Sequence, residues 1–546
     1  MVKSLLSLLA LRQSSILSGA TILMVAVFAS RFLGLIRDRL LVQNFDTSQA
    51  AIFFAAFRLP DLLFQILIFG SLSVAFIPVF TEIMHKEGEN EAFKFASSIL
   101  NLSLLIFGIV VLAAIIFVGP LNSLFVPGFS GTQKALTDQT TRIILVAQLI
   151  LVVGTFFFGI AHTYQRFIIP ALAPIFYNLG IIAGILFIAP TYGITGLGLG
   201  VILGAILHGL VQIPLVRSLG FKYKFTFDFF NSGVKEVFKL MSVRNIGLIA
   251  EQANETVGVA LASLVSYSSV TLLTFSNHLF AVPIGLFGAT IAQAALPVLS
   301  KEYAKNETES FKRTLLTTMH QILFLTLPSA AILIVLRIPV VRLVFGADLF
   351  SWDDTVLTGR TVAYFAIGLA AQSVVLLLVR GFYAMKDTKT PVLVSLSSIG
   401  LNIILSLVFI LVLKLGVWSL GLAYSVSIIF GTMTLVYFLS RKIQGFNNSD
   451  LIVPAVKMLV AASAAAFALY IPMKALDQLI FDTTRTVNLI MLTGIAASFG
   501  LAVYILLVWL LDVRELNTFT ELIKKIGKIK INLESEELPK DTGSFS

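Results

Sequence analysis

Long apolar runs separated by short polar stretches dominate the chain. A helix needs about 20 mainly apolar residues to cross a bilayer core of roughly 30 Å, where lipid offers the backbone no hydrogen-bond partner. The strict apolar–polar alternation of a membrane barrel is absent. The pattern therefore predicts an all-α polytopic membrane protein with about 14 transmembrane helices. The predicted spans are residues 15–36, 50–80, 93–118, 141–164, 168–189, 193–216, 239–267, 271–298, 315–337, 357–384, 391–414, 417–440, 451–473 and 486–511.

Composition supports a membrane protein. The 546 residues are 57% hydrophobic and 12% charged, whereas a soluble chain is about 25% charged. This balance argues against a soluble enzyme, a disordered protein and a nucleic-acid-binding domain. The chain has no cysteine and five scattered histidines, so we expect neither a disulfide nor a metal site. No small-residue cleavage site clearly follows the first apolar run, which predicts a retained helix rather than a signal peptide.

The basic residues predict the orientation. Roughly two thirds of the 39 Lys and Arg fall in the N-terminus, the loops after the even-numbered spans and the tail. Positive loops mark the cytoplasmic side, so both termini are expected in the cytoplasm. This placement also accounts for the net charge of +10 without nucleic acid. The polar tail carries alternating Lys and Ile at 524–530, which is typical of a juxtamembrane segment attracted to anionic lipids.

An internal repeat organises the spans. The segment around Pro78 resembles the segment around Pro297, 219 positions later, and a weaker match pairs Tyr164 with Tyr383 at the same offset. Two parallel six-helix repeats would place a substrate site between the halves, with alternating access by rocking. The predicted divisions are an N-terminal lobe, a C-terminal lobe, two added helices and a basic cytoplasmic tail: 1–217, 218–445, 446–512 and 513–546.

Arginines in the first two spans need an explanation, because a charge at mid-bilayer costs at least ~3 kcal/mol. Arg31 and Arg37 either snorkel to phosphates at the membrane surface or line a wet site, in which case Gly34 would allow a bend that brings them together. Arg58 either donates to an anionic ligand or pairs with Asp61, three residues along the same helix.

Polar residues also cluster in the seventh span. Glu251 and Glu255 are four residues apart and share a helix face, where two carboxylates repel each other. We expect a coupling-ion or proton site there; the alternative is a structural pair with an arginine of the other half. His278, in the eighth span beside Asn277, is either a hydrogen-bonded core residue or a titratable residue facing a cavity.

Several motifs together resemble one family. They are Ser30–Arg31–x–x–Gly34–x–x–Arg37–Asp38, Phe57–Arg58–Leu59–Pro60 and, most specifically, Phe382–Tyr383–Ala384–x–Lys386–Asp387–Thr388–Lys389–Thr390–Pro391. Over roughly residues 10–510, in this order and with this span layout, the chain resembles the MurJ-type lipid II flippases of the multidrug/oligosaccharidyl-lipid/polysaccharide exporter superfamily.

The resemblance implies a site. In that family, cavity arginines bind the pyrophosphate of lipid II, the undecaprenyl-linked peptidoglycan precursor. It therefore implies substrate binding by Arg31, Arg37 and Arg58, by His278 at a place that is usually arginine, and by Asn277 beside it. Some members bind sodium through a span 7 aspartate and span 11 polar residues. The matching places are Gly258, Asn402 and Ser406, of which only Asn402 remains a clear oxygen ligand.

These features predict a flippase that moves lipid II from the inner to the outer leaflet by alternating access. We expect no enzymatic activity, no nucleic acid partner, membrane lipids as surroundings and a monomer, with sodium or a proton as the possible coupling cation. The alternatives are an exporter of another polyprenyl-linked oligosaccharide or a cation-coupled drug exporter, which Arg31 and Arg37 disfavour. A glycosyltransferase would need loop carboxylates such as Asp348, Asp353 and Asp354, and a scaffold would not explain the buried arginines.

Overall fold

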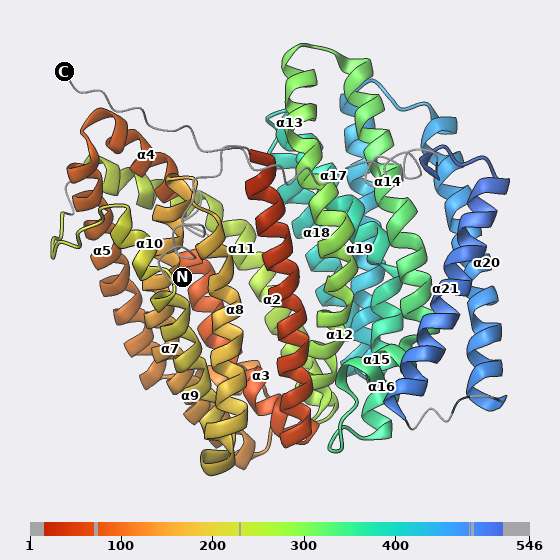
Figure 1. The fold of residues 1–546 in the computed structure, drawn as a ribbon, viewed down its shortest axis with the longest axis horizontal. Coiled ribbons are helices and arrows are strands. Elements are labelled where there is room, and N and C mark those ends of the chain that lie inside the picture. Colours follow the sequence, from red (N-terminus) through yellow and green to blue (C-terminus); the bar gives the residue numbers. More distant parts are fainter. Residues whose placement is uncertain (1–15, 70–74, 229–230, 480, 482–484, 517–546) are drawn as a thin grey trace, which may run out of the picture.

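The computed structural model describes residues 16–69, 75–228, 231–479, 481 and 485–516, and within them every regular element is a helix. The basic stretch at 524–530 lies outside these residues. Figure 1 shows the helices as two bundles side by side, with α20 and α21 at the far edge of the second bundle. The all-α fold is confirmed.

The first bundle, the N-terminal lobe, is built from the helices that the first six predicted spans contain. These are α2 (Ile16–Asn44), α3 (Thr47–Phe64), η1 (Gln65–Phe69), α4 (Ile77–Lys86), α5 (Glu89–Ile116), α6 (Val118–Phe125), α7 (Gly131–Thr163), α8 (Ile168–Ala183), η3 (Gly184–Ile188), α9 (Ala189–Leu210) and α10 (Ile213–Ser218).

The second bundle, the C-terminal lobe, has a similar succession of elements, with α16 and α17 in the place of α7 and with α19 in the place of α9 and α10, followed by the two added helices. These are α11 (Ser232–Val265), α12 (Ser269–Pro283), η4 (Ile284–Ala289), α13 (Thr290–Ala304), α14 (Thr308–Val335), α15 (Arg337–Phe345), α16 (Trp352–Ile367), α17 (Leu369–Ala384), α18 (Lys389–Leu407), η5 (Val408–Val412), α19 (Trp418–Lys442), α20 (Asn448–Leu479) and α21 (Thr486–Leu510).

The duplication is visible in the helix boundaries. Helices α5 and α14 both have 28 residues and begin 219 positions apart, at Glu89 and Thr308. The π-helical turns η1, η3, η4 and η5 interrupt α3, α8, α12 and α18 at corresponding places. Helices α7 and α17 end 221 positions apart, at Thr163 and Ala384, so the pairing of Tyr164 with Tyr383 is two residues out of register.

Ten helices among the described residues are long and apolar enough to cross a membrane, or eleven if the bent pair α16 and α17 counts as one span. This number falls below fourteen for a structural reason. The stretch Ile168–Ser218 counts once although its chain kinks at Gly193 (φ +60°) and holds two of the predicted spans. Helices α2 and α11, which carry Arg31, Arg37, Glu251 and Glu255, are not among the ten. The count of fourteen stays a prediction.

Glycines let α8 and α9 pack closely after that kink. A Cβ on Gly180 would lie 2.3 Å from the Cα of Gly204, and one on Gly184 would lie 2.4 Å from the Cα of Gly200. Without these side chains the two backbones can touch, which is how small residues drive helix association in lipid.

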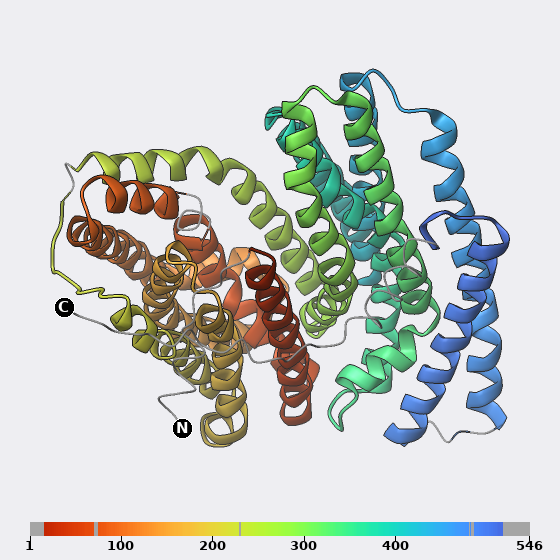
Figure 2. The same ribbon diagram turned by 45° about the horizontal axis from the view of Figure 1, so that its top comes forward.

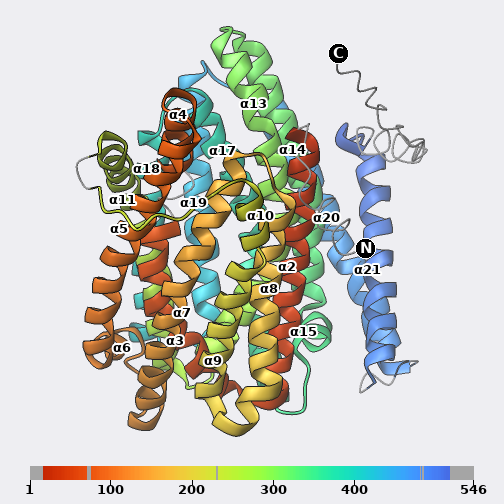
Figure 3. The ribbon, with the colours of Figure 1, turned by 60° about the vertical axis from the view of Figure 1, so that its left-hand side comes forward.

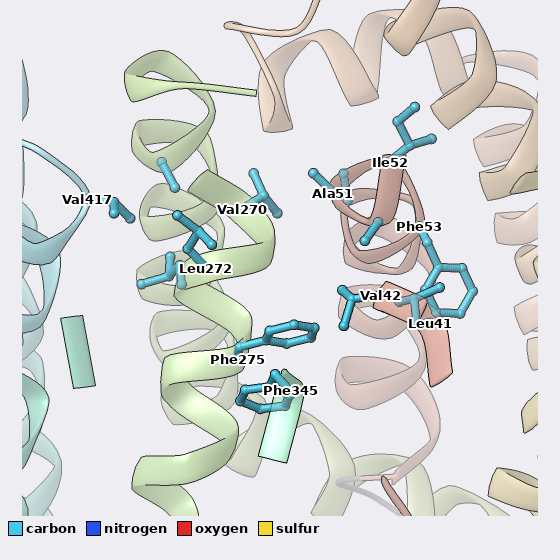
Figure 4. Close-up of a cluster of buried hydrophobic side chains, with 14 of the residues drawn as sticks. Leu41, Val42, Ala51, Ile52, Phe53, Val270, Leu272, Phe275, Phe345 and Val417 are labelled. Carbon is cyan, nitrogen blue, oxygen red and sulfur yellow. The ribbon is translucent and has the colours of Figure 1, made fainter. Parts of the chain in front are cut away.

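The two lobes meet at one end of the molecule, which we call the closed end. It comprises the α2–α3, α6–α7, α11–α12 and α15–α16 connections. An apolar cluster joins the lobes there, with Val42 and Ala51 of the N-terminal lobe facing Phe275 and Val270 of the C-terminal lobe (Figure 4).

Four hydrogen bonds cross between the lobes at the closed end. Thr47 Oγ1 donates to Asp354 at 3.0 Å, and Thr271 Oγ1 donates to the carbonyl of Thr47 at 2.7 Å. Arg39 donates to the carbonyl of Leu343 at 2.7 Å, and the amide of Gly128 donates to Ser263 Oγ at 3.1 Å. The closed end is thus held by an apolar cluster and a few polar contacts.

Helices α20 and α21 lie apart from the lobe interface and pack on α14 (Figure 3). Buried Tyr504 donates to the carbonyl of Phe324 at 3.0 Å, and Lys457 donates to the carbonyl of Leu511 at 2.7 Å. A buried contact of 3.4 Å joins His320 to Glu515, just beyond α21. The added helices are therefore attached to the C-terminal lobe alone in the described part of the chain.

Candidate functional site

The candidate site lies where α2, α3 and α8 of one lobe face α11 and α12 of the other. Figure 2 shows α11 running from the far end of the N-terminal lobe toward α12, so this helix follows both lobes along its length. Buried Val234 and Val237 near its start belong to the core of the N-terminal lobe, and Leu261 and Ala262 near its end belong to the closed-end cluster. The predicted polar residues lie between these two anchored ends.

Asp38 is the centre of one polar cluster. Its side chain is fully buried, and its Oδ1 accepts from Nη2 of Arg37 at 2.8 Å while its Oδ2 lies 2.6 Å from Nδ1 of His278. Arg37 also donates to Asn178 of α8 at 3.2 Å. Two oxygens of one buried carboxylate therefore orient a cation of α2 and a ring of α12, which fixes both side chains across the lobe interface.

Arg31 lies two helical turns before this cluster. It is exposed, and its Nη1 donates to the carbonyl of Ala281 on α12 at 2.8 Å. A Cβ on Gly285 would come within 2.9 Å of the same nitrogen, so the bare backbone of η4 lets the guanidinium lie against it. Among the described residues that carbonyl is its one hydrogen-bond acceptor, which leaves further donors of the guanidinium available.

Arg58 pairs across the lobes rather than within its own helix. Its Nη1 lies 2.6 Å from Glu255 Oε2 on α11, and Nε donates to Thr256 at 3.0 Å. Its remaining nitrogen donates to the backbone carbonyl of Gln252 at 3.0 Å. Asp61, the alternative partner in the sequence, accepts from Gln148 instead. For Glu255 the structure therefore contains the alternative arrangement, an ion pair with an arginine of the other half.

The polar residues of α11 point to different neighbours. Asn254 accepts from Nδ2 of Asn402 on α18 at 2.7 Å, while Oδ1 of Asn402 is buried without a hydrogen-bond donor among the described residues. Glu251 is exposed, one turn from Glu255. No group of three or more His, Cys, Asp or Glu side chains within the described chain could hold a metal ion.

Asn277 lies beside His278 on α12 and is exposed. The structure therefore brings Arg37 and His278 together through Asp38, and places Arg31 on α12 and Arg58 on α11. It does not bring Asn277 into either cluster among the described residues.

Sequence reasoning missed Asp38 as a central residue, and it missed Asn178, Gln252 and Thr256 as partners. The sequence does contain a sign that Asn178 has a partner. It is the only polar side chain other than Tyr177 in the apolar run 168–189. A buried amide in such a run needs a partner, and here it also donates to Ser30 of α2.

Comparison with known proteins identifies one family. A family model described as lipid II flippase MurJ matches residues 45–491. A probable lipid II flippase MurJ of Bdellovibrio bacteriovorus is 27% identical over 501 residues, covering 90% of this chain and 95% of that protein. A lipid II flippase MurJ of Burkholderia cenocepacia is 26% identical over 404 residues, covering 72% of this chain and 77% of that protein.

Solved structures agree. A lipid II flippase MurJ in an inward closed conformation has a TM-score of 0.74 at 26% identity, covering 89% of this chain and 98% of that one. An inward-facing multidrug resistance transporter of the MATE family and the MOP superfamily has a TM-score of 0.64 at 14% identity, covering 76% of this chain and 94% of that one. The second likeness concerns the fold alone.

Proposed function

This chain belongs to the MurJ family of lipid II flippases, and we propose that the guanidinium groups between its lobes receive the diphosphate of lipid II. The protein is a multi-pass transporter of the bacterial inner membrane that carries the lipid-linked peptidoglycan precursor from the inner to the outer leaflet by alternating access. A planar guanidinium suits phosphate oxygens because it donates two parallel hydrogen bonds.

The observation that carries this assignment is Arg31. It is an exposed guanidinium on a helix of one lobe that already reaches the other lobe, at the carbonyl of Ala281. An anion between the lobes could take up its remaining donors without breaking an ion pair. Arg37 would contribute from the adjoining cluster, where Asp38 holds it and His278 in place.

Arg58 requires an exchange of partners, because Glu255 occupies its Nη1. We assign the coupling cation, a proton or sodium, to Glu255 and its neighbours on this basis. A cation that neutralises this carboxylate would free Arg58 for the diphosphate. The buried Oδ1 of Asn402 is an oxygen that could serve sodium nearby, and Glu251 would add a second carboxylate to the same helix face.

We further propose that the protein acts as a monomer, breaks no covalent bond and binds no nucleic acid. The closed end would face the outside and both termini the cytoplasm, in agreement with the excess of Lys and Arg in the loops of the opposite end. Inner-leaflet lipid II would then enter from the cytoplasmic side.

Replacement of the essential lipid II flippase in a depleted bacterium tests the site. We expect the parent chain to support growth and to expose lipid II on the outer leaflet, while Arg31→Ala and Arg37→Ala do neither at equal membrane levels. Arg360→Ala is the matched control, since Arg360 is exposed and stacks on Trp418 at 4.3 Å, away from the lobe interface. Equal growth from all four chains would remove the assignment.

A further inference from the structure

The connection between α10 and α11 is an extended segment, residues 221–228, that lies along α5. The amide of Lys224 donates to Ser97 Oγ at 3.1 Å, and Asn101 Nδ2 donates to the carbonyl of Thr226 at 2.9 Å. Tyr223 OH donates to Asn101 Oδ1 at 2.7 Å. We call this segment the strap, because side chains of α5 hold its backbone at several points.

The strap explains polar residues that are out of place on α5. Ser97, Ser98 and Asn101 are at most 4% exposed, in a helix that from Phe95 to Ile116 is otherwise apolar except for Ser103. Ser98 Oγ lies 2.8 Å from the hydroxyl of Thr226. These residues face the strap rather than lipid, so their hydrogen-bonding groups are satisfied within the protein.

The strap also carries exposed aromatic and basic side chains. Phe225 is 78% exposed, Tyr223 53% and Phe227 41%, although large aromatic side chains are usually well buried. Lys222 and Lys224 alternate with them and are exposed. Figures 1 and 2 both show this segment running around the outside of α5, at the edge of the molecule.

We propose that the strap is a membrane-surface anchor that binds anionic lipid headgroups of the inner leaflet. Its aromatic rings would lie at the level of the headgroups, and its two lysines would contact lipid phosphates. This inference concerns a surface outside the lobe interface and does not depend on the transport assignment.

Continuity with the lipid-facing surface favours a membrane over a protein partner. Further along α5, the exposed side chains Leu105, Ile109 and Leu112 form an apolar surface suited to lipid tails. The strap crosses the same helix nearer its start, at Ser97 and Asn101. The aromatic rings and ammonium groups of the strap therefore lie at the border of this apolar surface. Lipid headgroups lie at the same place relative to the lipid tails of a leaflet.

The absence of cysteine from the chain allows a clean test. Phe225→Cys in the full-length protein, labelled with an environment-sensitive fluorophore, is reconstituted into vesicles of phosphatidylcholine alone or mixed with phosphatidylglycerol. We expect blue-shifted emission and quenching by headgroup spin-labelled lipid, both stronger in the anionic vesicles. Lys222→Gln with Lys224→Gln should weaken the lipid quenching about twofold in anionic vesicles.

The matched control is Lys86→Gln with Lys305→Gln, which removes two charges from other polar connections and should leave the quenching unchanged. Asn101→Ala should also weaken it, because the strap loses the side chain that binds Tyr223 and Thr226. Quenching by aqueous iodide but not by lipid would overturn the anchor and favour a protein partner. Equal lipid quenching with and without the strap lysines would overturn the recognition of anionic headgroups.

Discussion

Individual charges in this protein are balanced across the lobes, and a single sequence does not reveal such partners. Arg58 and Asp61 are three residues apart, which makes a local pair plausible. The structure instead pairs Arg58 with Glu255, at a sequence separation of 197, and gives Asp61 to Gln148. The sequence drew attention to Arg58 and Glu255, but which charged residues meet depends on how the helices cross.

Removal of Glu255 tests the value of this pair. Glu255→Ala leaves the 8% exposed Arg58 with neutral partners, so we expect a loss of about 1–2 kcal/mol in unfolding free energy. This lies below the 3–5 kcal/mol typical of a fully buried pair because the Glu255 side chain is 55% exposed and therefore screened. Thermal unfolding of the purified protein in detergent measures the change.

A double-mutant cycle completes this test. Arg58→Met combined with Glu255→Ala should cost less than the sum of the two single changes, because neither charge is then left without its partner. Glu251→Ala is the control, since this exposed neighbour has no described hydrogen bond or ion pair. Additive losses from Arg58→Met and Glu255→Ala would show that the ion pair contributes nothing.

At the scale of an element, the most specific motif of the sequence has a local structural role. Asp387 lies in the turn between α17 and α18, where its Oδ1 accepts from the amides of Lys389 and Thr390, and its Oδ2 pairs with Lys442 of α19. Lys386 occupies the left-handed region at φ +59°. The sequence identified this motif through resemblance, but which helices it joins became clear only from the structure.

Asp387→Asn should weaken the contact between the α17–α18 turn and Lys442 of α19. Burial opposes ionisation of Asp387, but hydrogen bonds from Lys442 and Thr390 outweigh it and lower the pKa of this carboxyl to about 2. Its contribution is therefore complete above the ordinary value of 3.8 and is lost as the pH falls toward 2. We expect a loss of about 1 kcal/mol, because Asn can still accept from the two amides but no longer forms the ion pair with Lys442.

The pH dependence distinguishes this mechanism from a general packing defect. Thermal stability of the parent and of Asp387→Asn should differ by a constant amount from about pH 5 to about pH 8. The exposed Asp477→Asn, near the end of α20, is the control and should match the parent. A difference between parent and Asp387→Asn that disappears near neutral pH would contradict the assigned role.

At the scale of the whole molecule, the sequence predicted two related bundles with a site between them. It could do so because each repeat carries its own apolar pattern and its own proline-containing segments. It could not predict where the bundles touch, since the closed end is made largely of small and apolar residues that also suit lipid or a lobe core. Ala51, for example, is fully buried opposite Val270 and carries no signal of an interface (Figure 4).

Gly128 tests whether the closed end is a separable contact. A Cβ there would lie 2.0 Å from the backbone carbonyl oxygen of Ser263 in the other lobe, a distance that no side-chain motion can relieve. Gly128→Ala should therefore shift the population toward forms in which the lobes part at this end. With Ala51→Cys as the only cysteine, we expect labelling by a water-soluble maleimide to be about tenfold faster, which corresponds to a bias of about 1.4 kcal/mol.

Gly131→Ala is the matched control, because this glycine begins α7 three residues later and a Cβ there meets no atom within 4 Å. It should label at the parent rate, and size-exclusion profiles of all three proteins should agree. The closed end is expected to separate during transport, so Gly128→Ala should also slow the return of the transporter to the form described here. Identical labelling rates for Gly128→Ala and Gly131→Ala would show that contact between these two loops does not hold the lobes together.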